Sequence, residues 1–190
     1  MNVAYQGTHT LQAIGAFNTG AKPITVFGQA AGIEGLRENS KQHYAPDQCI
    51  GVIKFDNGVR AVLQCGENAP KVGTGTINTH KRIAVYGTRG FIHWTMWSWE
   101  TSSDGKMKFG IHQYDDEDIL GQAALTEAMF DWMEDQNAVH LLNLDAALQD
   151  FNIILGIYAS AIHHRVVALP VDPQANLLAS LRTHLATDVI

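Results

Sequence analysis

The sequence lacks the features that mark several large classes of protein. Its 190 residues include 13 lysines and arginines against 19 aspartates and glutamates, a formal net charge of -6. Nucleic acids and anionic membranes attract basic patches, so we expect neither as a partner. No apolar run approaches the roughly 20 residues of a membrane-spanning helix, and the first residues lack the basic and apolar segments of a signal peptide. With only 2 cysteines and no CxxC pair, we expect a reduced, cytoplasmic protein.

Motifs that would identify an enzyme class directly are also missing. The sequence contains no Walker A lysine motif, no GxSxG and no HExxH. The nearest match to a dinucleotide-binding loop is "KVGTGTIN", where Gly73 and Gly75 are present but Asn78 occupies the place of the third glycine. The pattern around it predicts neither a buried strand before it nor a helix after it. We therefore expect no nicotinamide cofactor to be bound by this chain alone.

The residues that are present predict a folded protein of mixed secondary structure. Hydrophobic residues make up 46% and charged residues 17% of the chain, which is typical of a globular domain. The segment "QGTHTLQAIGAF" predicts a helix, "ITVFGQAAGI" a strand, and the region from Cys49 to Tyr114 several more strands. Long helical patterns follow. Because strands and helices segregate along the chain, the predicted class is α+β.

The clearest local pattern is a hairpin in "CIGVIKFDNGVRAVLQCG". Asn57-Gly58 favours a two-residue type I′ turn. That turn places Ile50 opposite Cys65 and turns Cys49 to the other face, so a disulfide between the cysteines is not expected. One face then carries Ile50, Val52, Ala61 and Leu63. Because neither face is cleanly polar, we expect helices to cover one and a partner subunit the other.

Two later helices are predicted from apolar residues spaced three and four apart. The first follows Asn143 as N-cap, and its predicted buried stripe is Leu144, Leu148, Phe151, Leu155, Tyr158 and Ile162. The second follows Asp172 and carries the stripe Leu177, Leu181 and Leu185. His163 and His164 end the first helix. Adjacent helical residues do not face one another, and cations at a helix C-terminus complement its dipole, so no metal site is expected there.

Taken in order, these segments resemble the C-terminal domain of the glucose–fructose oxidoreductase / inositol dehydrogenase / MocA (Gfo/Idh/MocA) family. "YQGTHTLQAI" resembles its Gly-x-His segment, and "KRIAVYGTRGFIHW" its I-x-V-x-G-T-x-G strand pair. The hairpin and the closing helices are similar as well. The resemblance spans nearly all of the sequence. It implies a single domain over residues 1–190, with an open, largely antiparallel or mixed β-sheet and helices packed on one face.

The resemblance implies part of an oxidoreductase, because the family's N-terminal Rossmann domain and the catalytic lysine in its Glu-Lys-Pro segment have no counterpart here. The implied function is that of a substrate-binding and oligomerisation domain in a NAD(P)-dependent enzyme for sugars or cyclitols, inactive on its own. NAD or NADP is expected for the full-length family. The implied partners are a sugar or polyol and a second copy of the chain, bound through the open sheet face. The alternative is a non-catalytic binding or assembly module derived from that domain.

Three positions carry the implied chemistry. His9 matches the family's catalytic histidine, and an imidazole suits proton removal from a substrate hydroxyl at neutral pH. Tyr5 and Gln12 stand where the family usually has acidic residues, so they are candidate substrate hydrogen-bonders without negative charge. Trp94, within the aromatic cluster "HWTMWSW", is a candidate platform for a sugar ring. The alternatives are a helix-entry histidine, packing of Tyr5 and Gln12, and packing of the tryptophan in a sheet or subunit interface.

Overall fold

The computed structural model describes residues 7–37, 45–66, 81–135, 137–172 and 176–187. The chain divides into two compact units, one made of Met1–Ala69 and Leu144–Ile190, the other of Pro70–Asn143. Within the described residues each unit contains one antiparallel four-stranded sheet, accompanied by several helices in the first unit and by one in the second. The α+β class and the antiparallel pairing are therefore confirmed, but the strands fall into two sheets where the sequence suggested one.

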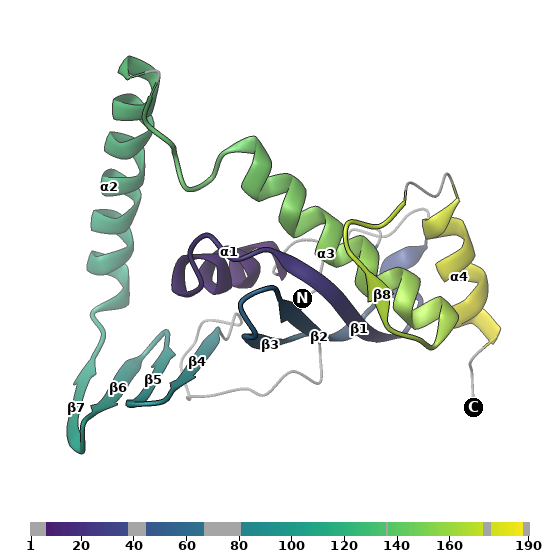
Figure 1. Cartoon of the computed structure of the whole chain (residues 1–190), viewed down its shortest axis with the longest axis horizontal. Helices are drawn as coiled ribbons and strands as arrows, with labels where there is room; N and C mark the ends of the chain where they lie inside the picture. Colours follow the sequence, from purple (N-terminus) through teal and green to yellow (C-terminus); the bar gives the residue numbers. More distant parts are fainter. Residues whose placement is uncertain (1–6, 38–44, 67–80, 136, 173–175, 188–190) are drawn as a thin grey trace. The chain divides into compact units, whose positions relative to one another are not determined.

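The first unit is built around a sheet with the strand order β3-β2-β1-β8 (Figure 1). Its elements are α1 (Thr8–Phe17), β1 (Pro23–Ala31), the 3-10 turn η2 (Glu34–Leu36), β2 (Gln48–Phe55), β3 (Arg60–Gly66), α3 (Leu144–His163), β8 (Val167–Ala168) and α4 (Leu177–Thr187). Helix α3 packs along β1, and α1 and α4 contact α3. The expected helical layer on one face of this sheet is thus present.

Close contact between β1 and α3 depends on small residues. A Cβ atom on Gly28 would lie 2.8 Å from the Cα of Ile157, and one on Gly156 would lie 2.6 Å from a methyl of Val26. The backbone N–H of Gly28 donates to Oγ of Ser160 at 2.8 Å, and that hydroxyl donates to the carbonyl of Arg165 at 2.6 Å. Glycine and serine therefore let the helix lie directly on the strand, and Ser160 pairs two backbone groups in the core.

The predicted hairpin exists, but its predicted register is wrong by one residue. Phe55 N–H donates to the carbonyl of Val59, so the loop contains three residues, and Gly58 adopts φ +87°. A three-residue loop with glycine in the left-handed region is the other common solution for such a sequence. Cys49 consequently lies directly opposite Cys65, and both are buried as free thiols. A one-residue slip reverses every side chain on a strand, so the predicted faces are reversed on β2.

The buried side of α3 also differs from the predicted stripe. Tyr158 is buried as expected, whereas Leu144, Leu148 and Phe151 are exposed. The residues of α3 that face the core include Asp150, Ile153, Ile154, Ile157 and Ala161. Apolar residues surround most of this helix, and the small residues that allow contact with β1 decide which side is buried. The stripe of α4 is confirmed, because Leu177, Leu181 and Leu185 are all buried.

The second unit contains β4 (Arg82–Gly87), β5 (Gly90–Thr95), β6 (Ser98–Ser103), β7 (Lys106–Ile111) and the helix α2 (Tyr114–Glu134). The strands form a meander in which each is antiparallel to the next. The sequence "SWETSS" of β6 has little apolar alternation, so periodicity alone does not mark it as a separate strand. No residue of α2 is buried. Across the described part of the chain, no helix is long and apolar enough to span a membrane.

Candidate functional site

His9 lies in the first turn of α1 and its side chain is exposed. The helix starts immediately after Gly7, and Leu11 anchors it in the core with 2% of its surface exposed. Gln12 follows one turn after His9, so the two side chains share one side of the helix. Tyr5, the third candidate in this segment, lies outside the described residues.

Gln12 forms a hydrogen bond with a carboxylate that was not among the candidate site residues predicted from the sequence. Its amide nitrogen Nε2 donates a hydrogen bond to Oδ2 of Asp150 on α3. Asp150 is 5% exposed, and burial raises the pKa of its carboxyl group to about 6, while the hydrogen bond from Gln12 opposes this shift. Its position at the start of the buried side of α3, followed by Ile153, Ile154 and Ile157, is the sequence signal that could have revealed it.

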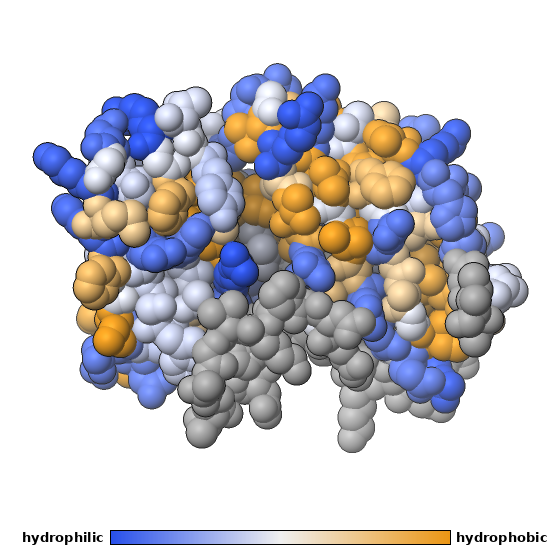
Figure 2. Space-filling view, turned by 90° about the horizontal axis from the view of Figure 1, so that it is seen from below, coloured by the Kyte–Doolittle hydropathy of each residue, from blue (hydrophilic) through white to orange (hydrophobic). Residues whose placement is uncertain are grey.

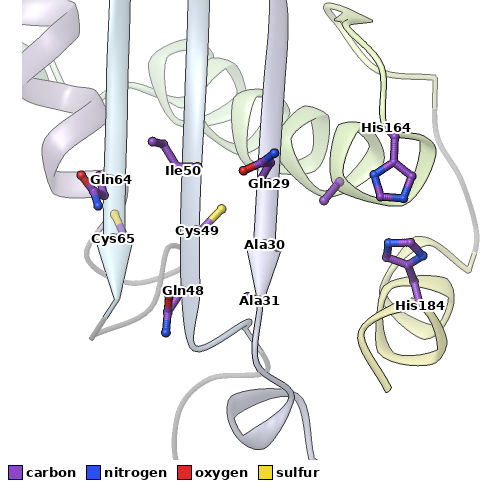
Figure 3. Close-up of a pocket in the computed structure, with 11 residues that line it drawn as sticks. Gln29, Ala30, Ala31, Gln48, Cys49, Ile50, Gln64, Cys65, His164 and His184 are labelled. Atoms are coloured by element: carbon purple, nitrogen blue, oxygen red, sulfur yellow. The ribbon is translucent and has the colours of Figure 1, made fainter. Parts of the chain in front are cut away.

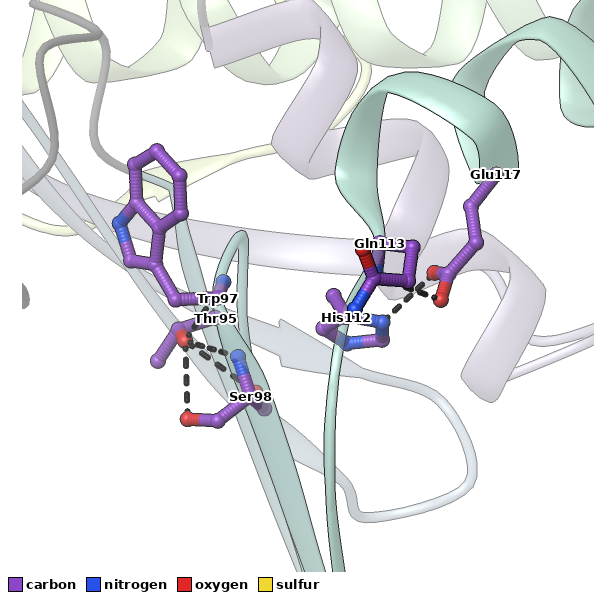
Figure 4. Close-up of polar contacts among 6 residues, drawn as sticks. All are labelled: Thr95, Trp97, Ser98, His112, Gln113 and Glu117. Atoms are coloured by element: carbon purple, nitrogen blue, oxygen red, sulfur yellow. Dashed lines mark hydrogen bonds and ion pairs between the residues drawn. The ribbon is translucent and has the colours of Figure 1, made fainter.

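Trp94 lies on β5 in the second unit, where it is half-buried and pairs across the sheet with Ile83 and Trp99. Its ring centre is 5.5 Å from that of His112. Nδ1 of His112 contacts Oε2 of Glu117 at 2.6 Å, and Oε1 of the same carboxylate accepts the backbone N–H of Gln113 at 3.2 Å (Figure 4). Glu117 thereby joins the end of β7 to the start of α2 and orients the imidazole beside Trp94.

The turn between β5 and β6 holds the rest of the aromatic cluster. The hydroxyl Oγ1 of Thr95 accepts the backbone N–H groups of Trp97 and Ser98 at 3.2 and 3.1 Å (Figure 4). Within the described residues, neither Nε1 of Trp97 nor Nε2 of His112 has a hydrogen-bond partner. Both nitrogens are buried, so each is a polar group in the sheet's interior without a described partner.

His93 belongs to a different cluster from Trp94, because neighbouring residues of a strand point to opposite faces. Nδ1 of His93 contacts Oε1 of Glu100 at 2.7 Å, and Nε2 contacts the hydroxyl of Tyr86 at 2.9 Å. A carboxylate, an imidazole and a phenol therefore form one hydrogen-bonded chain across β4, β5 and β6. The tautomer of the ring decides the direction of each hydrogen bond.

A cavity of about 330 Å³ opens in the first unit between the strand ends and the helices α3 and α4 (Figure 3). Its lining includes Cys49, Cys65, His164 and His184. Although thiols and imidazoles are ligands for zinc, no group of three or more His, Cys, Asp or Glu side chains in the described residues is arranged to hold a metal ion. Burial raises the pKa of both thiols, that of Cys65 to about 11.

Comparison with protein families gives one match that covers most of the chain. Residues 6–169 match the model described as "Oxidoreductase family, C-terminal alpha/beta domain", of the Gfo/Idh/MocA group. This range contains His9, Gln12, Trp94 and Asp150. No curated protein matches the sequence.

Solved structures share the fold at low sequence identity. An oxidoreductase from Agrobacterium radiobacter in complex with NAD+, L-tartaric acid and magnesium has a TM-score of 0.63 at 19% identity, over 87% of this chain and 48% of its own. Levoglucosan dehydrogenase in complex with NADH and levoglucosan has a TM-score of 0.61 at 15% identity, over 87% and 49%. The WlbA dehydrogenase from Bordetella pertussis, with NADH and UDP-GlcNAcA, has a TM-score of 0.57 at 15% identity, over 90% and 46%. The chain thus spans about half the length of these proteins.

Proposed function

The chain belongs to the C-terminal alpha/beta domain of the Gfo/Idh/MocA oxidoreductase family, and we propose that it is the substrate-binding domain of a NAD(P)-dependent enzyme for sugars or cyclitols. The observation that carries the proposal is the family match over residues 6–169, which includes α1 with His9. Support comes from relatives that were crystallised with a nicotinamide cofactor and a sugar or sugar derivative.

In this proposal His9 is the general base that accepts the proton from the substrate hydroxyl. Its place in the first turn of α1 leaves the imidazole exposed to a ligand, and an imidazole accepts a proton readily at neutral pH. Gln12 engages Asp150 through Nε2, so its amide oxygen is the group that remains to accept a hydrogen bond from a polyol hydroxyl. Trp94, which belongs to the second unit, is proposed separately as an aromatic platform for the apolar side of a sugar ring.

The nicotinamide cofactor itself does not fit this chain. Such a cofactor accepts the hydride from the substrate carbon, but the described residues contain no strand, glycine loop and helix in the order that holds a dinucleotide. The nearest glycine pattern, at residues 71–78, lies outside the described residues and has Asn78 at the third glycine position. We infer that the 190-residue chain binds a polyol without cofactor and has no dehydrogenase activity alone.

The proposal is tested by ligand binding to the purified chain. Saturation-transfer NMR with a panel of polyols and sugars should detect a ligand, and His9→Ala should weaken its binding while NADH and NADPH show no heat in calorimetry. Phe17→Ala, a change at an exposed residue at the other end of α1, is the matched control. Saturable NADH binding, or polyol oxidation by the chain alone, would contradict this proposal.

A second function, that of an assembly module, is favoured by one row of side chains on the first sheet. Phe27, Val52 and Val62 lie opposite one another on β1, β2 and β3, and they are 39%, 39% and 62% exposed. Val52 lies on the face of β2 opposite the buried residues of that strand. Figure 2 shows that hydrophobic residues occur at the surface of the molecule. Contiguous exposed apolar residues of this kind are typical of interaction surfaces.

We therefore also propose self-association through this sheet face. Analytical ultracentrifugation should show an oligomer that dissociates in Val62→Lys. The matched control is Val166→Lys, which places the same charge on a valine of similar exposure outside the sheet. A monomeric wild-type chain, or an oligomer that both variants leave intact, would exclude the sheet face as the contact. Because this test does not involve a ligand, it can fail independently of the substrate-binding proposal.

A further inference from the structure

Two histidines that lie twenty positions apart in the sequence meet in the first unit. His164 follows the last residue of α3, and His184 lies in the last turn of α4. Their ring centres are 5.0 Å apart and the ring planes are inclined by 57°. Figure 3 shows the two rings pointing toward one another at the edge of the cavity, with a nitrogen of each on the facing side.

The separation of the rings is the one that a shared metal ion requires. Zinc binds imidazole nitrogen at about 2.0–2.1 Å, which puts the metal roughly 3.2 Å from each ring centre. Two imidazoles on one tetrahedral zinc ion then have centres about 5.2 Å apart. The observed 5.0 Å needs only a slight adjustment of the side chains.

The backbone at His164 supplies an independent observation. His164 adopts φ +51°, in the left-handed region that glycine usually occupies just after a helix. A side chain at such a position costs free energy relative to glycine, and residues held in this way concentrate at functional sites. In this chain the unfavourable conformation directs the imidazole of His164 toward His184.

The surroundings favour a small cation. The carbonyl ends of α3 and α4 carry partial negative charge, and both histidines stand at these ends. The exposed guanidinium of the adjacent Arg165 opposes this attraction from the protein surface. The cavity of about 330 Å³ beside the rings leaves room for further ligands of the metal.

We propose that His164 and His184 form a binding site for a divalent late transition metal, with Zn²⁺ as its representative. Two protein ligands leave two tetrahedral positions for water or an exchangeable small ligand in the cavity. The sequence pattern predicts no metal site here, because His164 and its neighbour His163 do not face one another on a helix. The structure instead provides a partner from another helix.

The experiment is a calorimetric titration of the reduced, tag-free chain with zinc chloride. We expect one zinc ion per chain, bound at least about tenfold more weakly in His164→Gly and in His184→Ala. Glycine is the residue that the left-handed position prefers, so His164→Gly removes a ligand without disturbing the end of α3. His163→Ala is the matched control and should bind zinc like the wild type.

A second readout is the midpoint of thermal unfolding. Zinc should raise it in the wild type and in His163→Ala but not in His164→Gly or His184→Ala, because only a site present in the folded state stabilises the fold. Three outcomes would each overturn the proposal. They are the absence of zinc binding by the wild type, unchanged binding in both ligand variants, and binding that is lost only on Cys49→Ser.

Discussion

The amide of Gln12 on α1 donates a hydrogen bond to the buried carboxyl group of Asp150 on α3. This contact joins the helix that carries the proposed base His9 to the helix at the centre of the first unit. It also gives Gln12, a neutral residue one turn after His9, a carboxyl group as its partner. The position of α1 therefore depends on a group whose charge changes with pH.

The first prediction concerns the pH dependence of stability. The pKa of Asp150 is raised from 3.8 to about 6 in the fold, mainly by burial. The fold therefore binds the proton of Asp150 more tightly than the unfolded chain does. The stability that this proton contributes is fully present below about pH 4 and is lost as the pH rises through 6. We expect Asp150→Asn to be more stable than the wild type by on the order of 2 kcal/mol above about pH 7.

Urea unfolding across this pH range measures the difference between the two proteins. The difference should shrink toward zero below about pH 4, where the carboxyl group is protonated in both states. Asp145→Asn changes an exposed carboxylate on the same helix and should leave the pH dependence of the wild type unaltered. A stability difference for Asp150→Asn that does not vary with pH would contradict this assignment.

The second prediction concerns the contact between β1 and α3. A Cβ on Gly28 would lie 2.8 Å from backbone atoms of Ile157, so Gly28→Ala should lower the free energy of unfolding by about 2–4 kcal/mol. Gly15→Ala is the matched control. No atom lies within 4 Å of its added Cβ and its place is helical, so that change should stabilise by about 0.5–1 kcal/mol. Equal effects of the two changes in a urea titration would rule out the close packing described here.

The third prediction concerns the hydroxyl of Ser160. It accepts from Gly28 and donates to the carbonyl of Arg165, and the residue is 0% exposed. Ser160→Ala leaves two polar groups without this partner and should cost about 2–3 kcal/mol in thermal or urea unfolding. Thr19→Ala removes an exposed hydroxyl that bonds the carbonyl of Ala16, and should cost less than about 0.5 kcal/mol. A loss in Ser160→Ala no larger than in the control would show that the hydroxyl is dispensable.

The fourth prediction concerns the thiols of Cys49 and Cys65. They are 5% and 7% exposed, and burial raises the pKa of both, so little thiolate is present at neutral pH. Reaction with Ellman's reagent should be at least about 100-fold slower in the native chain than in urea, where both thiols should react. Rapid modification of either thiol in the folded protein would show that the strand pair opens readily.

Local features of the amino-acid order predict the elements well. The helix at Thr8–Phe17, the strand at Pro23–Ala31 and the buried stripe of α4 follow from apolar spacing and flanking glycine or proline. The α+β class follows from the order of these elements, and the ordered motifs from "YQGTHTLQAI" onward indicated the family. These features are local, so interactions between near neighbours in the chain suffice to specify them.

Features that depend on distant residues could not be obtained in this way. The turn pattern at Asn57-Gly58 fits loops of two or three residues, and only pairing along β2 and β3 placed Cys49 opposite Cys65. Apolar residues surround most of α3, so its fit against Gly28 selected the buried side and brought Asp150 to Gln12. His164 and His184 meet because α4 folds back onto α3. Periodicity predicted the helices and strands, whereas side-chain packing between them determined the register, the buried faces and the partners of the polar groups.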